Sequence, residues 1–176
     1  MDLLILSDSH GHPEAVEEAV RRTHPDALLF AGDGLRDLAR ADLPLGLPVY
    51  AVAGNCDVCL LPLVIGKEIL DPEEELLLTL DGVRILLCHG HTLGVKHGLG
   101  GAIAHATARH ADVLVFGHTH EPLIRTILPD APEAVALGLS KPLLLLNPGS
   151  AGSRTSPTFG TLTLRGGIPL AGHGTL

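Results

Sequence analysis

The stretch from residue 112 to residue 120, D-V-L-V-F-G-H-T-H, guides the interpretation of the whole chain. Residues 113–116 form a short, unbroken apolar run between a charged residue and a glycine, which is typical of a strand buried on both faces. His118 and His120 follow two positions apart, and residues at that spacing on an extended chain point to the same side. We therefore expect both imidazoles in one space beyond the carboxyl end of the strand, where open parallel sheets bind their ligands.

Four other apolar segments also end in side chains that can bind a metal. They cover residues 3–6, 27–31, 49–53 and 83–88, and the sequences S-D-S-H, G-D-G, G-N-C-D and H-G-H follow them. One H-x-H motif is a weak signal, whereas strand ends that repeatedly carry oxygen or imidazole donors are a strong one. Together the segments place these candidate ligands at strand ends: Asp8, His10, Asp33, Asn55, His89, His118 and His120.

The length and composition favour a single domain over residues 1–176. Of the 176 residues, 45% are apolar and 18% are charged, which suits a folded chain with a sizeable core. Aromatic residues make up only 2% and the net charge is -8. We therefore expect neither a base-stacking platform nor a broad nucleic-acid surface. An acidic protein can still take an anionic substrate where bound metal supplies positive charge.

The cysteines and the apolar segments predict a cytoplasmic protein. The three cysteines are too scattered for a disulfide framework. No apolar run is long enough to span a bilayer, and no secretory signal is expected, so we expect no membrane association. Cys56 and Cys59 form a C-x-x-C motif, but no second such pair completes a structural zinc site. Pro62 follows where a redox motif would open a helix, which disfavours the redox interpretation.

The remaining segments predict a sandwich with helices outside. Asp81-Gly82 is a two-residue turn signal between two apolar runs and predicts a hairpin. The first half alternates strands and helices, which favours a parallel sheet with right-handed crossovers, and antiparallel pairs are expected in the second half. Helices are expected from Pro13 and over residues 35–40 and 98–110, and further strands over 75–80, 123–128, 143–146 and 158–164.

Three segments are harder to assign. Residues 60–70 are apolar but contain Pro62 and Gly66, and they suggest a self-association surface and hence a homo-oligomer. Residues 129–142 are expected to form a loop of undefined shape. The glycine-rich tail after about residue 165 is expected to fray.

The candidate ligands are too many for one transition metal and suit two ions about 3.5 to 4 Å apart. Mixed carboxylate, amide and imidazole donors favour manganese, iron or zinc over magnesium, and nickel shares these preferences. Asp33 is the expected bridge, because Gly32 and Gly34 let the backbone approach closely. Two such ions would lower the pKa of a shared water and hold phosphate oxygens for in-line attack.

The order D-S-H, G-D, G-N-C-D, H-G-H, G-H-T-H resembles the calcineurin-like metallophosphoesterase family, and above all its small bacterial and archaeal phosphodiesterases. The resemblance runs from residue 1 to about residue 154, and N-P-G-S at 147–150 matches the same subgroup. It implies an α/β fold, a four-layer αββα sandwich of two mixed β-sheets flanked by helices. It also implies a phosphodiesterase or phosphatase in which a bridging hydroxide attacks the phosphorus of a small phosphodiester or phosphomonoester.

The resemblance divides the candidate ligands between two divalent ions per chain, with manganese expected ahead of iron, zinc or nickel. Asp8, His10 and His120 would hold the first ion, Asn55, His89 and His118 the second, and Asp33 would bridge the two. His89 is preferred to His91 because it comes first after its strand. His91 would instead lie on the side of the first metal, contact the substrate, or donate a hydrogen bond to one of the metal ligands.

The G-N-C-D loop departs from many family members, which carry a histidine after the asparagine as the acid for the leaving group. This chain has Cys56, and a thiol with a reference pKa of about 8.5 is a poor substitute for imidazole. We therefore expect a preference for esters with acidic leaving groups. Asn55, Cys56 and Asp57 form the candidate catalytic loop, in which Asp57 either orients a group or stabilises the turn.

Other residues carry weaker expectations. Arg154 is either a phosphate clamp or a surface arginine. Ser9 either touches phosphate or is a loop hydroxyl, and Gly149 and Ser150 would support the site through the backbone. The six histidines in helical or loop stretches are expected to be solvated or rim side chains, with His12 and His97 the two nearest to the site.

Two other functions stay open from the sequence. The family fold also serves as a scaffold in the retromer sorting complex, whose subunit resembles this chain in G-H-T-H and N-P-G-S but has lost metal ligands. A metal-dependent regulator that binds a nucleotide without hydrolysing it is the other alternative.

Overall fold

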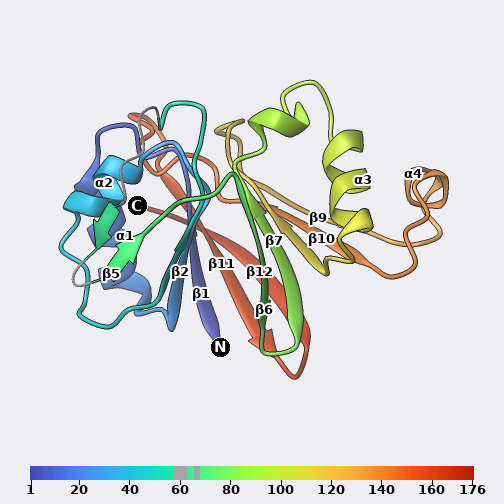
Figure 1. Cartoon of the computed structure of the whole chain (residues 1–176), viewed down its shortest axis with the longest axis horizontal. Helices are drawn as coiled ribbons and strands as arrows, with labels where there is room; N and C mark the ends of the chain where they lie inside the picture. Colours follow the sequence, from blue (N-terminus) through green and yellow to red (C-terminus); the bar gives the residue numbers. More distant parts are fainter. Residues whose placement is uncertain (58–62, 66–67) are drawn as a thin grey trace.

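The computed structural model describes residues 1–57, 63–65 and 68–176 and shows two five-stranded sheets packed against each other, with helices on both outer faces (Figure 1). The first sheet has the order β12-β11-β1-β2-β3. Its strands are β12 (Ile168–Thr175), β11 (Thr158–Arg165), β1 (Asp2–Leu6), β2 (Ala27–Phe30) and β3 (Val49–Ala51), and its helices are α1 (Pro13–Thr23) and α2 (Leu35–Arg40).

The second sheet has the order β6-β7-β8-β10-β9. Its strands are β6 (Glu75–Leu80), β7 (Val83–Cys88), β8 (Val113–Val115), β10 (Leu143–Asn147) and β9 (Leu123–Ile127). The 3-10 helix η1 (His91–Leu93) follows β7, α3 (Gly100–Ala108) and α4 (Pro132–Ala136) cover the outer face, and β4 (Leu63–Ile65) and β5 (Glu68–Leu70) pair separately. The four-layer αββα sandwich of mixed sheets is therefore confirmed.

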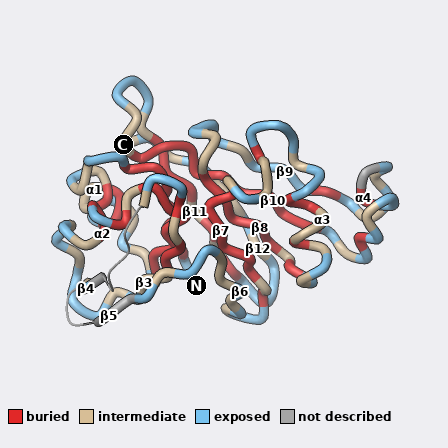
Figure 2. The backbone as a smooth tube through the Cα atoms, turned by 45° about the horizontal axis from the view of Figure 1, so that its top comes forward, coloured by how far each residue is buried: buried red, intermediate tan, exposed pale blue. Residues whose placement is uncertain are grey.

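The central strands are buried on both faces, as their apolar runs predict (Figure 2). In β1, Leu3 and Ile5 pack into the cluster between the two sheets, while Leu4 and Leu6 pack outward against the cluster that includes α1 and α2. A third cluster lies between the second sheet and α3, with Ile103 and residues of β7, β8 and β10. Burial on both faces explains why these strands are apolar runs without alternation.

Three details of the predicted fold are wrong in whole or in part. The parallel pairs β1–β2 and β2–β3 and the antiparallel pairs β6–β7, β10–β9 and β11–β12 follow the predicted division. The division is not complete, because β8 runs parallel to both β7 and β10 and β1 pairs antiparallel with β11. Residues 129–142 contain α4. The tail after residue 165 does not fray, because β12 pairs with β11 along its whole length, from Arg165↔Ile168 to Thr158↔Thr175.

Part of the 60–70 segment lies outside the described residues. Only 63–65 and 68–70 are described, as the antiparallel pair β4–β5. Cys59, the second cysteine of the C-x-x-C motif, also lies outside. Within the part of the chain that is described, no helix has both the length and the apolarity needed to cross a membrane.

Candidate metal centre

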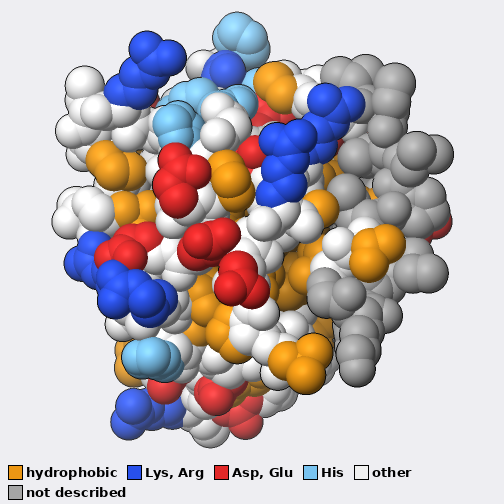
Figure 3. All heavy atoms as spheres, turned by 90° about the vertical axis from the view of Figure 1, so that its left-hand side faces the viewer, with side chains coloured by type: hydrophobic (Ala, Val, Ile, Leu, Met, Phe, Trp, Pro, Cys, Tyr) orange, Lys and Arg blue, Asp and Glu red, His pale blue; other side chains and the backbone are white. Residues whose placement is uncertain are grey.

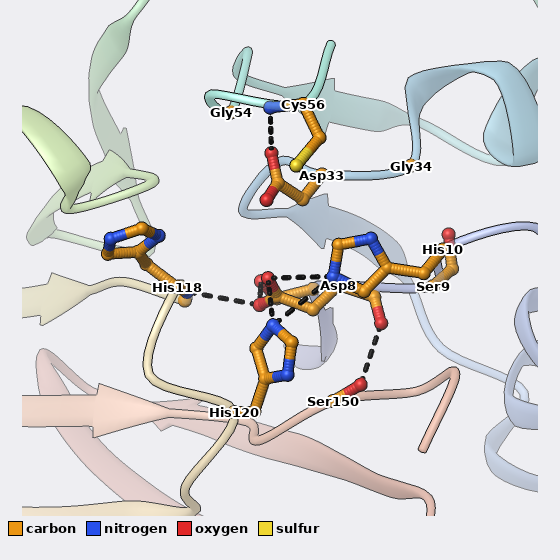
Figure 4. Close-up of polar contacts among 12 residues, drawn as sticks. Asp8, Ser9, His10, Asp33, Gly34, Gly54, Cys56, His118, His120 and Ser150 are labelled. Atoms are coloured by element: carbon orange, nitrogen blue, oxygen red, sulfur yellow. Dashed lines mark hydrogen bonds and ion pairs between the residues drawn. The ribbon is translucent and has the colours of Figure 1, made fainter. Parts of the chain in front are cut away.

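Loops after β1, β2, β7 and β8 bring six of the seven predicted ligands together at one edge of the sandwich. Among the described residues three donor groups form there, and within each the donor atoms lie within 4.8 Å of one another. Figure 4 shows Asp8 between histidines from different loops, and Figure 3 shows histidine side chains gathered at the top of the face that carries α1 and α2. The groups are Asp8 with His10 and His120, Asp33 with His89 and His118, and His10 with Asp33 and Cys56.

The first group converges on one oxygen of Asp8. Asp8 Oδ1 lies 3.1 Å from His120 Nε2 and 3.7 Å from His10 Nε2, and the two imidazole nitrogens lie 3.2 Å apart. The other oxygen, Asp8 Oδ2, accepts hydrogen bonds from the Ser7 hydroxyl and from the backbone N–H of His118, the latter at 3.0 Å. Oδ1 is buried without a hydrogen-bond partner among the described residues, so it is free to bind a cation.

The second group converges on His89. Its Nδ1 lies 2.7 Å from the carbonyl oxygen of Ala31, which places the proton on Nδ1 and leaves the Nε2 lone pair available. Nε2 is buried, lies 3.3 Å from Asp33 Oδ2 and has no hydrogen-bond partner in the described part of the chain. Burial lowers the pKa of His118 to about 4, with further contributions from the nearby His89 and Lys96. The His118 imidazole is therefore neutral at pH 7. A neutral imidazole is the form that binds metals.

The electrostatics of these groups also favour a cation. Burial alone would lower the pKa of His89, but Asp33 and Asp8 outweigh it and raise the pKa above its usual value. Burial raises the pKa of Asp8 despite the hydrogen bond from Ser7, because its charge is poorly solvated. Buried polar atoms without partners call for an explanation such as a bound ion. Asp8 Oδ1 and His89 Nε2 are two of the four buried atoms without a partner among the described residues, and a third, His91 Nδ1, belongs to the histidine beside the second group. Together with carboxylate and imidazole donors, the first two fit a divalent metal.

Most of these donors sit on strained backbone. Positive φ angles between 43° and 67° occur at Asp8, His10, Asp33, His118 and His120. Non-glycine residues rarely adopt this conformation, which costs of order 1–3 kcal/mol each and clusters at functional sites. The extended conformation expected for His118 and His120 is therefore wrong, although both imidazoles lie in donor groups beyond the end of β8. His118 lies in the group with Asp33 and His89, and His120 lies beside Asp8, as Figure 4 shows.

The G-N-C-D loop packs directly on Asp33. The backbone N–H of Cys56 donates to Asp33 Oδ1 at 2.7 Å, and the side-chain amide of Asn55 donates to Cys56 Sγ at 3.3 Å. Burial, then the Asp33 carboxylate, raises the pKa of the Cys56 thiol, so it is protonated at neutral pH. Asn55 is exposed beside this thiol, and its role as a ligand stays a prediction.

The other candidate residues, His91, Arg154, His97 and His12, belong to none of the donor groups. His91 sits beside the second group rather than the first, with ring centroids 5.4 Å from His89 and 6.1 Å from His118. Arg154 and His97 are exposed, and His12 contacts Glu14 at 2.9 Å. A groove of about 750 Å³ lies between α1 and residues 42–48, and none of its described lining residues belongs to a donor group.

Hydrogen bonds around the donors involve polar residues that the motifs left without a role. Asn147 Nδ2 donates to the carbonyl oxygen of Gly117 at 2.8 Å and to the Thr119 hydroxyl at 3.1 Å, which holds the G-H-T-H loop. Its position at the end of a buried strand was the available signal. Ser150 contacts the first group through its side chain rather than through the predicted backbone support, because its hydroxyl donates to the Asp8 carbonyl oxygen at 2.8 Å.

Comparison with known proteins identifies relatives of the expected kind. The model of the calcineurin-like phosphoesterase superfamily domain matches residues 1–167. YsnB of Bacillus subtilis, a probable metallophosphoesterase, is 35% identical over 122 residues, which are 68% of this chain and 64% of that protein. The phosphodiesterase YfcE of Escherichia coli is 31% identical over 140 residues, which are 70% of this chain and 71% of that protein.

Solved structures share the fold over nearly the whole chain. A predicted phosphoesterase from Streptococcus pneumoniae has a TM-score of 0.70 at 24% identity, over 99% of this chain and 88% of that one. Vps29 of Entamoeba histolytica, solved with zinc, has a TM-score of 0.65 at 18% identity, over 99% of both chains. At these identities the likeness shows the fold alone. The family match over residues 1–167 confirms the resemblance seen in the motifs, and the chain belongs to the calcineurin-like phosphoesterase superfamily.

Proposed function

We propose that this protein is a metal-dependent phosphoesterase, and more specifically a phosphodiesterase with a dinuclear site. The observation that carries the proposal is the pair of adjacent donor groups, each with a buried atom that has no partner among the described residues, Asp8 Oδ1 in one and His89 Nε2 in the other. Family membership and the phosphodiesterase name of a relative support the same reaction class. Manganese is the proposed metal, because carboxylate and imidazole donors suit it.

Each proposed ligand is assigned to one of two ions. Asp8, His10 and His120 would hold one ion, His89, His118 and Asn55 the other, and Asp33 would bridge them. When bound, the two ions supply Lewis-acid activation of a water and hold the phosphate oxygens. The protein fixes the donors: Ser7 and the His118 N–H orient the Asp8 carboxylate, and the Ala31 carbonyl oxygen orients the His89 ring. These contacts align the donors before the substrate arrives.

The leaving group receives little help from this chain. The protonated Cys56 thiol sits next to Asp33 and is a weak acid, since burial and the neighbouring carboxylates raise its pKa. Good general acids have a pKa close to the working pH. We therefore propose small phosphodiesters or phosphomonoesters with acidic leaving groups as substrates. His91 and Arg154 stay weaker candidates for contacts with the substrate.

The test combines metal content with hydrolysis. Protein purified without added metal is analysed for its elements, then assayed on bis-para-nitrophenyl phosphate with manganese and after chelation. Asp33→Ala is expected to abolish hydrolysis, whereas Asp130→Ala, an exposed aspartate in a turn, is the matched control. Unchanged hydrolysis in Asp33→Ala would overturn the mechanism. Metal binding without hydrolysis of any mono- or diester would favour the scaffold or the nucleotide-binding regulator instead.

The setting and the assembly of the protein are part of the proposal. Cys56 and Cys88 are free thiols, which suits a reducing, cytoplasmic compartment. A homo-oligomer is kept as a proposal, and sedimentation of the purified protein tests it.

A further inference from the structure

Asp57 joins the two loops that carry Asp33 and Asn55. Its Oδ2 accepts the backbone N–H of Asp33 at 2.7 Å and that of Gly54 at 2.9 Å. Its Oδ1 accepts the N–H of Gly34 at 3.0 Å and that of Leu35, the first residue of α2, at 2.9 Å. One carboxylate therefore holds four backbone donors from both loops, which satisfies it without a cation.

The two loops also hold each other in the opposite direction. Asp33 accepts the N–H of Cys56, so each loop offers a carboxylate to the backbone of the other. Their backbones meet at glycines: a Cβ on Gly32 would lie 2.7 Å from the nitrogen of Gly54. Any movement of the G-N-C-D loop is therefore transmitted to the carboxylate of Asp33.

Asp37 makes a corresponding link to a third loop, the one after β1 that carries Asp8 and His10. It lies on α2, is only 3% exposed, and its Oδ2 accepts the Ser9 hydroxyl at 2.6 Å and the backbone N–H of Gly11 at 2.8 Å. These bonds flank His10 on both sides. Ser9 is buried and its hydroxyl points at Asp37, so the loop-hydroxyl interpretation of Ser9 is favoured over contact with phosphate.

Helix α2 thus supports three loops that carry proposed ligands, those after β1, β2 and β3. Its first N–H group, on Leu35, donates to Asp57, and its own Asp37 accepts hydrogen bonds from the loop after β1. Neither carboxylate belongs to a donor group. The ligands Asp8, His10 and Asp33 adopt left-handed conformations that local sequence disfavours, so surrounding contacts must hold them. We propose that Asp37 and Asp57 are positioning residues that set the spacing of the metal ligands and thereby the metal affinity. This inference rests on the proposed function.

The test measures metal binding apart from catalysis. Metal-free wild type, Asp57→Asn and Asp37→Asn are titrated with Mn²⁺ by calorimetry and with Co²⁺ by its visible absorption, and the unfolding of each metal-free protein is recorded. Asparagine keeps the size of aspartate but offers one accepting oxygen, so part of the backbone N–H groups lose their partner. We expect metal affinity to fall about 10- to 100-fold, as is typical when a residue behind a ligand is changed, with an altered Co²⁺ spectrum.

The matched control is Asp112→Asn. Asp112 accepts the backbone N–H of Arg84 at 2.8 Å and pairs with Lys141, so it is a similar structural carboxylate, but at the amino end of β8, away from His118. The control is expected to lower stability and leave the affinity and the spectrum unchanged. Ser9→Ala is a milder second variant, which removes one of the two bonds to Asp37 and is expected to fold with a smaller loss of affinity.

The outcomes separate the two proposals. Wild-type affinity in folded Asp57→Asn, Asp37→Asn and Ser9→Ala overturns the positioning role, as does an equal loss in Asp112→Asn. A wild type that binds neither ion overturns the proposed function and this inference with it. Weakened binding in the site variants alone, at whatever cost in stability, supports the inference.

Discussion

Gly54→Ala tests whether the close contact between two loops sets the position of Asp33. A Cβ at Gly54 would lie 2.1 Å from Asp33 Oδ1 and 2.5 Å from its backbone nitrogen. Ordinary contacts begin at 3.4 Å, so the loop and the carboxylate must separate by about 1.3 Å at the first of these atoms. No positive φ is recorded at Gly54, so the backbone itself accepts alanine and the effect is steric.

A displacement of this size is large for a carboxylate that is proposed to hold a catalytic metal. A misplacement of about 1 Å can lower a rate by about 10²-fold, and an extra methyl group in a tightly packed place costs about 1–3 kcal/mol of stability. We therefore expect turnover of bis-para-nitrophenyl phosphate to fall about 100-fold at saturating Mn²⁺. Steady-state kinetics measures the rate, and denaturant unfolding measures the stability.

Gly100→Ala is the matched control. Gly100 lies at the start of α3, a Cβ there meets nothing within 4 Å, and no positive φ is recorded. Alanine should leave turnover unchanged and stabilise the protein by about 0.4–1 kcal/mol. Wild-type turnover in Gly54→Ala, or an equal loss in Gly100→Ala, would refute the steric reasoning.

Three further results are expected. Loss of a general acid lowers a rate by about 10²-fold or more. Cys56→Ser should slow hydrolysis of esters with acidic leaving groups by much less than this. A loss of three orders of magnitude in kcat would show that the thiol is central. Removing bound metal should lower the melting temperature, since a ligand at 100 times its Kd stabilises by about 2.7 kcal/mol; calorimetry with and without chelator checks this. Burial alone would raise the pKa of Glu75, but His105 and Arg109 outweigh burial and lower this pKa in the folded state. The ionised Glu75 carboxylate therefore stabilises the fold above its unfolded-state pKa of about 4.3, and this stabilisation is lost as the pH falls below that value. Glu75→Gln should therefore flatten this acid-side loss in urea unfolding curves, and an unchanged pH profile would contradict the assignment.

The location of the donors could be predicted because it follows from general rules. Apolar runs buried on both faces predict central strands, and the carboxyl ends of parallel strands meet at one edge of a sheet. Asp8, His89 and His118 each follow such a strand, and the structure brings all three to one edge. The motifs therefore indicated which residues meet without any knowledge of the side-chain geometry.

The tail could not be predicted from its own residues. Glycines suggested a loose end, yet in β12 they make close packing with the neighbouring strand possible. A Cβ at Gly174 would lie 2.2 Å from the ring of Phe159, and one at Gly172 would lie 2.9 Å from the Thr161 hydroxyl. The strand exists because β11 offers it a full set of backbone partners, which is a tertiary effect that local propensity does not contain.

The division of the acidic residues into ligands and supports also depends on tertiary contacts. Asp8, Asp33, Asp37 and Asp57 all lie in or beside the ligand loops, and residue type alone does not separate them. Hydrogen bonds distinguish two of the four: Asp57 has both oxygens occupied by backbone N–H groups, whereas Asp8 keeps Oδ1 buried and without a partner in the described structure. A buried carboxylate with all its acceptors filled gains little from a cation, and one with a free oxygen gains much. Hydrogen-bond satisfaction therefore separates Asp57, a supporting aspartate, from Asp8, a proposed metal ligand.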